Sequence, residues 1–284
     1  MVSPRTAETR LAQLTLVGLA IFAPIETYAS WQMLGGLWGL IHPLYIVTFA
    51  GMVLMFIGAT HSLRARPRSS PALLCIAHAW IAAYGLRSAF WRLNAVGRGL
   101  ELHFGIVELW ATVFAAAVAL AAFGVSFVLT LRAPVARGPS PARLRTLESG
   151  VAFFSLVSLA VFAPTETVAT WQMGGGAAAL VGPNFVHKLA GMVLLIIGVR
   201  HSLTARPGLA PGALCAAHAW WASTGWSATA GRVYAVSRGA RLRWGTPELW
   251  LVGLSTLLVL ATFSVSFYLT AQQSGSQMGG PKTE

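Results

Sequence analysis

Two histidines and a cysteine that could ligate a metal recur together in this chain. His61, Cys75 and His78 form the first set, and the same spacing returns 140 residues later in His201, Cys215 and His218. Between the histidines of the first set, a short polar segment, Ser62–Pro71, joins two long apolar stretches. If both stretches are helices, the two imidazoles lie at similar depth near one face of a membrane. Imidazole and thiolate groups in such a position are typical ligands of transition metals.

We predict that the histidines bind one b-type haem in each half of the chain. Two imidazoles from neighbouring helices can fill both axial positions of a haem iron. The predicted ligand pairs are His61 with His78 and His201 with His218. Arg66 and Arg206 follow the first histidine of each pair closely enough to meet the haem propionates.

Copper or zinc is the alternative cofactor. Cys75 lies three residues before His78 and so shares nearly the same helix face, as Cys215 does before His218. Each metal would then be held by the two histidines and the cysteine of one set. Small residues such as Gly51 and Gly58 lie beside the His61 face, where they leave room for a flat cofactor or for a closely packed helix. Either interpretation fits the spacing.

Four carboxylates lie inside apolar stretches, toward the opposite face of the predicted membrane. They are Glu26, Glu166, Glu108 and Glu248. Arg92 and Arg232 lie near the same depth, so an arginine–carboxylate pair would neutralise the charge of each partner. The functional alternatives are a general acid, a proton path, or a site for a quinone or a polar headgroup.

The chain repeats itself, and this repeat fixes the predicted architecture. Residues 12–130 align with 152–270 without a gap, and about half of the aligned positions are identical. Within the alignment some polar residues have no counterpart. Arg87 corresponds to Ser227, and His187 and Lys188 replace Val47 and Thr48; His42 and His103 correspond to Gly182 and Arg243. The two halves are therefore not chemically equivalent.

Composition places the chain in a membrane. Hydrophobic residues make up 56% of it and charged residues only 10%, with no aspartate, whereas soluble domains carry about 25% charged residues. Each half contains four apolar stretches long enough to cross a bilayer as helices. They lie near 11–30, 42–63, 72–91, 105–131, 151–170, 183–203, 212–231 and 245–271. The predicted fold is all-α and integral to the membrane: eight transmembrane helices formed by tandem duplication of a four-helix bundle.

The predicted organisation is a first repeat at 1–131, a cytoplasmic linker at 132–150, a second repeat at 151–271 and a disordered tail at 272–284. An even number of spans per repeat makes the two repeats parallel. Arginines are more frequent on the side of the termini, so the positive-inside rule predicts a multi-pass protein of the inner membrane with both termini in the cytoplasm. The net charge of +12 suits anionic lipid headgroups and requires no nucleic acid.

The four-plus-four plan, with histidines in each bundle, resembles the architecture of haem A synthase. The Glu-x-x-His-Arg pattern of that family is absent from this chain, so its activity is not implied. The stretches Pro24–Thr27 and Pro164–Thr167 resemble the Pro-x-Glu-Glu motif of tandem-repeat membrane lycopene cyclases, but without its second acidic residue.

Three functions follow from these patterns. The first is a redox protein that passes electrons to or from a quinone or a partner subunit. The second is an enzyme that uses a glutamate as the acid on an isoprenoid or lipid substrate. The third is a transporter or a structural subunit of a membrane complex.

Overall fold

The computed structural model describes residues 4–64, 71–132, 142–174, 176–204, 212–242 and 245–276. Every regular element in these ranges is a helix. The first half contains α1 (Pro4–Leu34), α2 (Leu37–Leu40), α3 (Pro43–Arg64), α4 (Ala72–Gly97) and α5 (Gly105–Leu131). The second half contains α6 (Ala142–Gly174), α7 (Ala177–Leu180), α8 (Pro183–Thr204), α9 (Gly212–Ser237) and α10 (Thr246–Ser276).

The protein is a multi-pass, all-α membrane protein. Among the described residues, six helices are long and apolar enough to cross a bilayer: α1, α3, α4, α5, α8 and α10. The two other long helices, α6 and α9, are not among these six. For α9 the reason is its central place: its small and polar residues face other helices, and a side chain that does not meet lipid has no need to be strongly apolar.

The turns between helices use glycine and proline in the same way in both halves. Gly36 and Gly176 have positive φ angles of 72° and 88° and begin the short helices α2 and α7. Pro43 and Pro183 then open α3 and α8, where the missing N–H of proline costs no helical hydrogen bond. These glycines and prolines reverse the direction of the chain after α1 and after α6.

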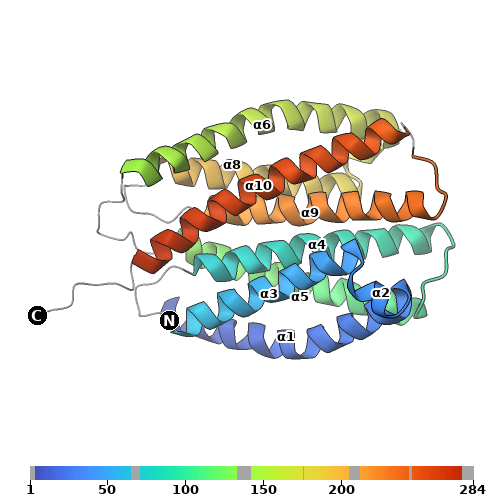
Figure 1. Cartoon of the computed structure of the whole chain (residues 1–284), viewed down its shortest axis with the longest axis horizontal. Helices are drawn as coiled ribbons and strands as arrows, with labels where there is room; N and C mark the ends of the chain where they lie inside the picture. The colour runs from blue at the N-terminus through green and yellow to red at the C-terminus, as the bar shows by residue number, and fades with distance from the viewer. Residues whose placement is uncertain are drawn as a thin grey trace, which may run out of the picture.

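The two halves meet along α4 and α9, which lie side by side at the centre of the molecule (Figure 1). The two helices approach closely at Ala72 and Gly212, where a Cβ added to Gly212 would lie 2.5 Å from the Cβ of Ala72. Both helices also carry fully buried alanines that belong to one core cluster: Ala79, Ala82, Ala83, Ala219 and Ala222. Helices α3 and α5 pack against α4, while α8 and α10 pack against α9. Small side chains thus let the two most central helices approach closely.

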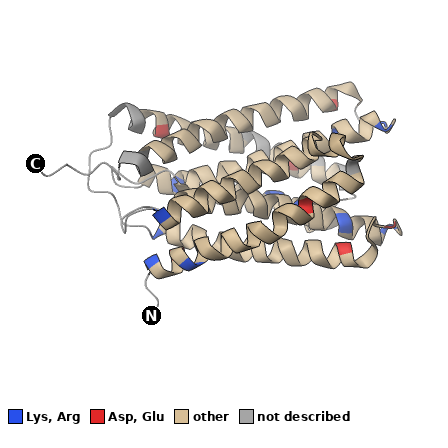
Figure 2. Ribbon diagram, turned by 60° about the horizontal axis from the view of Figure 1, so that its bottom comes forward, with Lys and Arg blue, Asp and Glu red and all other residues tan. Residues whose placement is uncertain are grey.

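The start of α1 and the end of α10 lie at one end of the bundle, and α2 lies at the other (Figure 1). We call the end that holds α2 the distal end. Charged residues gather toward the two ends of the helices and leave the middle of the bundle almost free of charge (Figure 2). This distribution is the one that a bilayer around the middle of the helices would impose.

Several helices are longer than the predicted apolar stretches, and two of them extend into the predicted linker and tail. α6 begins at Ala142, within the predicted linker, because Pro141 is the last residue there that disfavours a helix. α10 continues to Ser276, within the predicted tail. The rest of the linker, at 133–141, and of the tail, at 277–284, lies outside the described residues.

Candidate functional site

The second histidine of each predicted pair is buried in a network of hydroxyl groups. Thr15 Oγ1 on α1 lies 2.9 Å from His78 Nε2, and Ser126 Oγ on α5 lies 3.1 Å from His78 Nδ1. Only 3% of His78 is exposed. The network thus joins three helices of the first half through a single imidazole on α4.

The second half contains the same network at the equivalent positions. Ser155 Oγ and Ser266 Oγ lie 2.9 and 3.0 Å from Nε2 and Nδ1 of His218, which is 4% exposed. A neutral imidazole donates through one nitrogen and accepts through the other, so a hydroxyl on each side satisfies it fully. Either histidine would have to give up one of these bonds to ligate an iron.

The other predicted ligands do not join these histidines. His61 Nε2 is buried and has no partner, and Cys75 and Cys215 are fully buried. Within the described chain, no group of three His, Cys, Asp or Glu residues is placed to hold a metal ion. Arg66 and Arg206, the predicted propionate partners, lie outside the described residues.

Neighbouring helices fill the space beside the glycines. A Cβ added to Gly58 would lie 2.8 Å from the backbone oxygen of Leu73. One added to Gly198 would lie 2.7 Å from the Cα of Leu214. Of the two uses that the sequence left open for these small residues, helix packing is the one found here.

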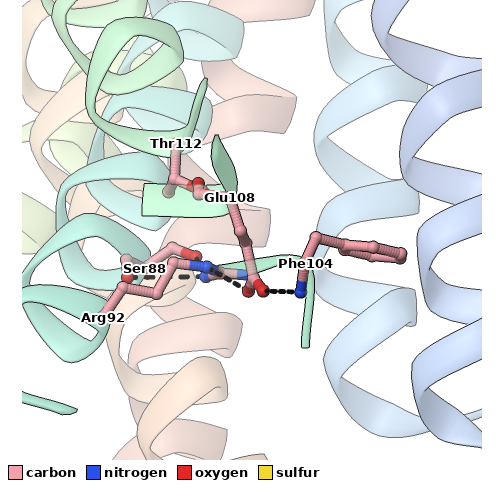
Figure 3. A network of polar contacts seen from close by, with 5 residues as sticks. All are labelled: Ser88, Arg92, Phe104, Glu108 and Thr112. Atoms are coloured by element: carbon pink, nitrogen blue, oxygen red, sulfur yellow. Dashed lines mark hydrogen bonds and ion pairs between the residues drawn. The ribbon is translucent and has the colours of Figure 1, made fainter. Parts of the chain in front are cut away.

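At the distal end, two of the four intramembrane carboxylates form the arginine pairs that we expected. Arg92 Nε donates to Glu108 Oε1 at 2.6 Å, and Arg232 Nε donates to Glu248 Oε1 at 2.8 Å. The backbone N–H of Phe104 donates to Glu108 Oε2, so this carboxylate also fixes the start of α5 (Figure 3). These pairs clamp α4 to α5 and α9 to α10.

The other two carboxylates, Glu26 and Glu166, differ from each other. Glu166 on α6 forms an ion pair with Lys188 on α8. At the position of Lys188 the first half carries Thr48, which lies near Glu26 and bonds to the backbone oxygen of Leu44. Glu26 has no ion pair with any residue that the structure describes. The cation whose field reaches it is Arg92, which is already bound to Glu108.

Two residues of α4 complete the first-half cluster. Tyr84 lies near Thr48, and the charges of Glu26 and Arg87 both act on it. Arg87 is partly buried and forms neither a hydrogen bond nor an ion pair with a described side chain. Among the described residues, the first half thus holds a carboxylate and a guanidinium that form no ion pair with each other.

Comparisons with known proteins give no identity for this chain: no family model, no curated protein and no solved structure matches it. The chemistry of the site itself must therefore indicate the function. Its residues can accept a proton at Glu26, donate hydrogen bonds from Tyr84 and Thr48, and hold an anion at Arg87.

Sequence reasoning singled out Arg87, His187 and Lys188 but missed the partners of the buried histidines. Thr15 and Ser126 are ordinary residues of apolar helices, and their hydroxyls bond to a residue far away in the chain. The repeat held the available signal, because Ser155 and Ser266 keep a hydroxyl at both equivalent positions.

Proposed function

We propose that this chain is an inner-membrane transport protein for a small polar solute. In this proposal it has eight spans, built as a tandem duplication of a four-helix bundle, with both termini in the cytoplasm. The solute site lies at the distal end, in the first half and along its boundary with the second. The second half is a copy whose charges neutralise each other.

The observation that carries the proposal is the unequal pairing of Glu26 and Glu166. Each half contributes one carboxylate and one unmatched cation: Glu166 with Lys188, and Glu26 with Arg87. In the second half the two charges touch, whereas in the first half they do not. A charge inside a membrane is costly without a partner, and such a charge is found where a ligand, an ion or water reaches it.

The arrangement of the halves supports transport over the other functions. The start of α1 and the end of α10 lie at one end, so α4 and α9 run in the same direction (Figure 1). Parallel repeats with a polar site at their interface are a common plan of secondary transporters. Pro24 and Pro164 also interrupt α1 and α6 shortly before the two glutamates, and a proline inside a helix leaves a carbonyl free and permits a bend.

The protonation state of the two glutamates can be tested with dicyclohexylcarbodiimide, an apolar reagent that modifies protonated carboxyl groups within membranes. We expect it to label Glu26 and to leave Glu166 unlabelled, as peptide mapping by mass spectrometry would show. Thr48→Lys should protect Glu26 by recreating the ion pair of the second half. Lys188→Thr is the matched variant and should expose Glu166. Equal labelling of both glutamates in the unaltered protein would contradict the asymmetry.

Transport itself is measured on proteoliposomes adsorbed to a solid-supported membrane, from the currents that follow a solute jump. The probes are sodium phosphate, sodium acetate, glycine and choline chloride. We expect a current with at least one probe, lost in Thr48→Lys and retained in Lys188→Thr. The transport function is rejected if no probe produces a current, or if Thr48→Lys leaves the current unchanged.

A redox function is the second candidate, and one observation favours it: His61 Nε2 is buried without a partner, as a vacant ligand would be. In this proposal His61 and His201 each contribute an axial ligand to a b-type haem, or a ligand to copper or zinc. An absorption spectrum and metal analysis of the purified protein test it. A Soret band that His61→Ala reduces by about half would support two haems; no absorbance and no bound metal would reject the proposal.

A further inference from the structure

Arg87 lies on the face of α4 that packs against the second half. It follows Ala83 by four residues, and Ala83 follows Ala72, which meets Gly212 of α9, by eleven residues or about three helical turns. It is also five residues nearer the middle of α4 than Arg92, or about 7–8 Å deeper in the bundle at 1.5 Å per residue. The side chain of Arg87 is therefore attached to α4 between the two halves, deeper in the bundle than the distal ion pairs.

The charges around Arg87 are positive and already paired elsewhere. Its electrostatic neighbours include Arg232 on α9 and His187 on α8, with Lys188 next to that histidine. Arg232 is bound to Glu248 and Lys188 to Glu166. No carboxylate of the described chain is therefore within ion-pair distance of Arg87. A guanidinium that lies deep in the bundle without a counter-charge attracts anions strongly.

Two further polar groups near this boundary are buried and have no hydrogen-bond partner among the residues that the structure describes. His187 is 4% exposed; its Nε2 is bonded to Thr224 Oγ1 at 2.9 Å, but its Nδ1 has no partner. Ser223 is fully buried and its Oγ also has no partner. Ser223 follows Gly212 by eleven residues, or about three helical turns, so it lies on the face of α9 that meets α4 at Ala72. Buried polar groups are nearly always satisfied, so these two indicate a missing hydrogen-bonding partner.

We infer that Arg87, His187 and Ser223 form a recognition site for an oxyanion, a carboxylate or a phosphate, between the two halves of the protein. The guanidinium binds two oxygens of such a group in a fork, and the serine hydroxyl and the imidazole contact the remaining oxygens. This inference rests on the proposed transport function and names the class of solute. The oxyanion is a free solute or the headgroup of an anionic lipid, which share this chemistry.

The sequence comparison between the halves agrees with one such site. The residue at the position of Arg87 in α9 is Ser227, and its hydroxyl donates to the backbone oxygen of Ser223 at 2.6 Å. The residue at the position of His187 in α3 is Val47. The cationic group and the imidazole therefore come from opposite halves and meet only at the boundary. A duplicated protein has a single boundary, so it has a single site of this kind.

Thermal unfolding of the full chain in dodecyl maltoside tests the inference. Sodium phosphate and sodium acetate are added at constant ionic strength against sodium chloride, because a specific ligand raises the Tm with its concentration. Dioleoylphosphatidylglycerol, compared with dioleoylphosphatidylcholine, tests the lipid source. We expect a saturable rise in Tm with phosphate, acetate or phosphatidylglycerol, but not with chloride or phosphatidylcholine. A rise with phosphatidylglycerol alone assigns the site to a lipid headgroup.

The variants identify the residue responsible. Arg87→Ser introduces the residue that the second half carries there, and it should abolish the rise in Tm. Arg87→Lys keeps the charge without the fork and should require a several-fold higher concentration. Arg98→Ser removes an exposed arginine that directly follows α4 and should respond as the unaltered protein does. If Arg87→Ser does not fold, an unchanged response in Arg87→Lys refutes the inference, as does the absence of any rise in the unaltered protein.

Thr48→Lys separates this inference from the transport function. It closes the Glu26 site but leaves Arg87 unchanged, so it should keep the rise in Tm while it loses the transport current. If currents depend on Thr48 and the Tm response does not depend on Arg87, the oxyanion site is wrong and transport stands. If the Tm response depends on Arg87 and no probe gives a current, the chain binds an oxyanion without transporting it.

Discussion

At the scale of single residues, the protein uses its buried polar groups in two different ways. His78 and His218 have both ring nitrogens bonded, and Glu108, Glu248 and Glu166 each have a cation. Such groups hold helices together in an apolar solvent, where a lost partner is hard to replace. Glu26, Arg87 and His187 instead retain capacity for another molecule. The difference between satisfied and unsatisfied groups therefore separates structural residues from candidate ligand contacts.

His78→Ala should destabilise the first half substantially. The change removes an imidazole that bonds to α1 and to α5, and it leaves a cavity on α4. We expect a loss of about 2–4 kcal/mol in the free energy of unfolding, from the lost hydrogen bonds and the cavity together. Ser126→Ala removes one partner only and should cost about 1 kcal/mol. Denaturant titration of the purified protein measures both; equal stability of His78→Ala and the unaltered chain would show that the network contributes little.

His42 gives the boundary between the halves a dependence on pH. It lies between α2 and α3, its Nδ1 accepts from the backbone N–H of Leu44, and its ring meets that of Tyr234 on α9 edge-on at 5.2 Å. Burial lowers the pKa of His42 from its ordinary value of 6.5. The unfolded chain therefore binds the proton more readily than the folded one, and stability rises with pH through this range.

The contribution of His42 should thus be complete above pH 6.5 and diminish as the pH falls through the lower pKa of the folded state. We expect the Tm to decrease between pH 7 and pH 5, and to decrease less in His42→Gly, which carries the residue of the second half. The Tm of both proteins in the same buffers provides the comparison. Parallel pH profiles would assign the acid sensitivity to another group.

At the scale of the elements, close helix contacts depend on a few glycines. Gly58→Ala places a Cβ 2.8 Å from the backbone of α4, which cannot move aside as a side chain can. We expect a loss of about 1–3 kcal/mol in the free energy of unfolding. Gly18→Ala on α1 is the matched control, because nothing lies within 4 Å of its added Cβ; alanine also favours the helix there. A cost for Gly18→Ala as large as that for Gly58→Ala would exclude the packing explanation.

The sequence predicted the positions of the long helices well, because apolar length and proline positions determine them locally. Pro43 and Pro183 stand at the first residue of α3 and α8, as the repeat suggested. The short helices α2 and α7 were not predicted, since a four-residue element has no period to detect. The partners of His78 and the different states of Glu26 and Glu166 depend on contacts between helices far apart in the chain. Unmatched neighbours such as Lys188 pointed to the two glutamates, whereas the signal for the partners of His78 was the hydroxyl kept at equivalent positions of the repeat.

At the scale of the whole molecule, the two halves share their structural contacts and differ in a few polar residues. Equivalent positions place the same hydroxyl–histidine–hydroxyl network and the same arginine–glutamate clamp in both halves, so both bundles are held together alike. The exceptions cluster at the distal end and along α4 and α9. In the proposed function, duplication supplied two similar bundles, and a small number of substitutions at their boundary made the site asymmetric.

The eight-span topology makes one prediction that a six-span topology contradicts. If only the six most apolar helices cross the membrane, α6 and α9 do not, and the chain after α8 lies on the side opposite the N-terminus. If all eight long helices cross, the chain after α8 lies on the side of the N-terminus. Fusions after Thr204 discriminate between the two topologies, because green fluorescent protein is fluorescent only in the cytoplasm and alkaline phosphatase is active only outside it.

With the N-terminus in the cytoplasm, eight spans predict fluorescence and no phosphatase activity for fusions after Thr204. Fusions at Gly182, between α7 and α8, should give the opposite result. For these fusions the two topologies differ in whether α6, which carries Glu166, crosses the membrane. If α6 stayed outside the bilayer, the ion pair between Glu166 and Lys188 would not be an intramembrane pair, and Glu26 would have no matched control within the chain. Phosphatase activity after Thr204 would therefore remove both the duplicated topology and the comparison on which the solute site depends.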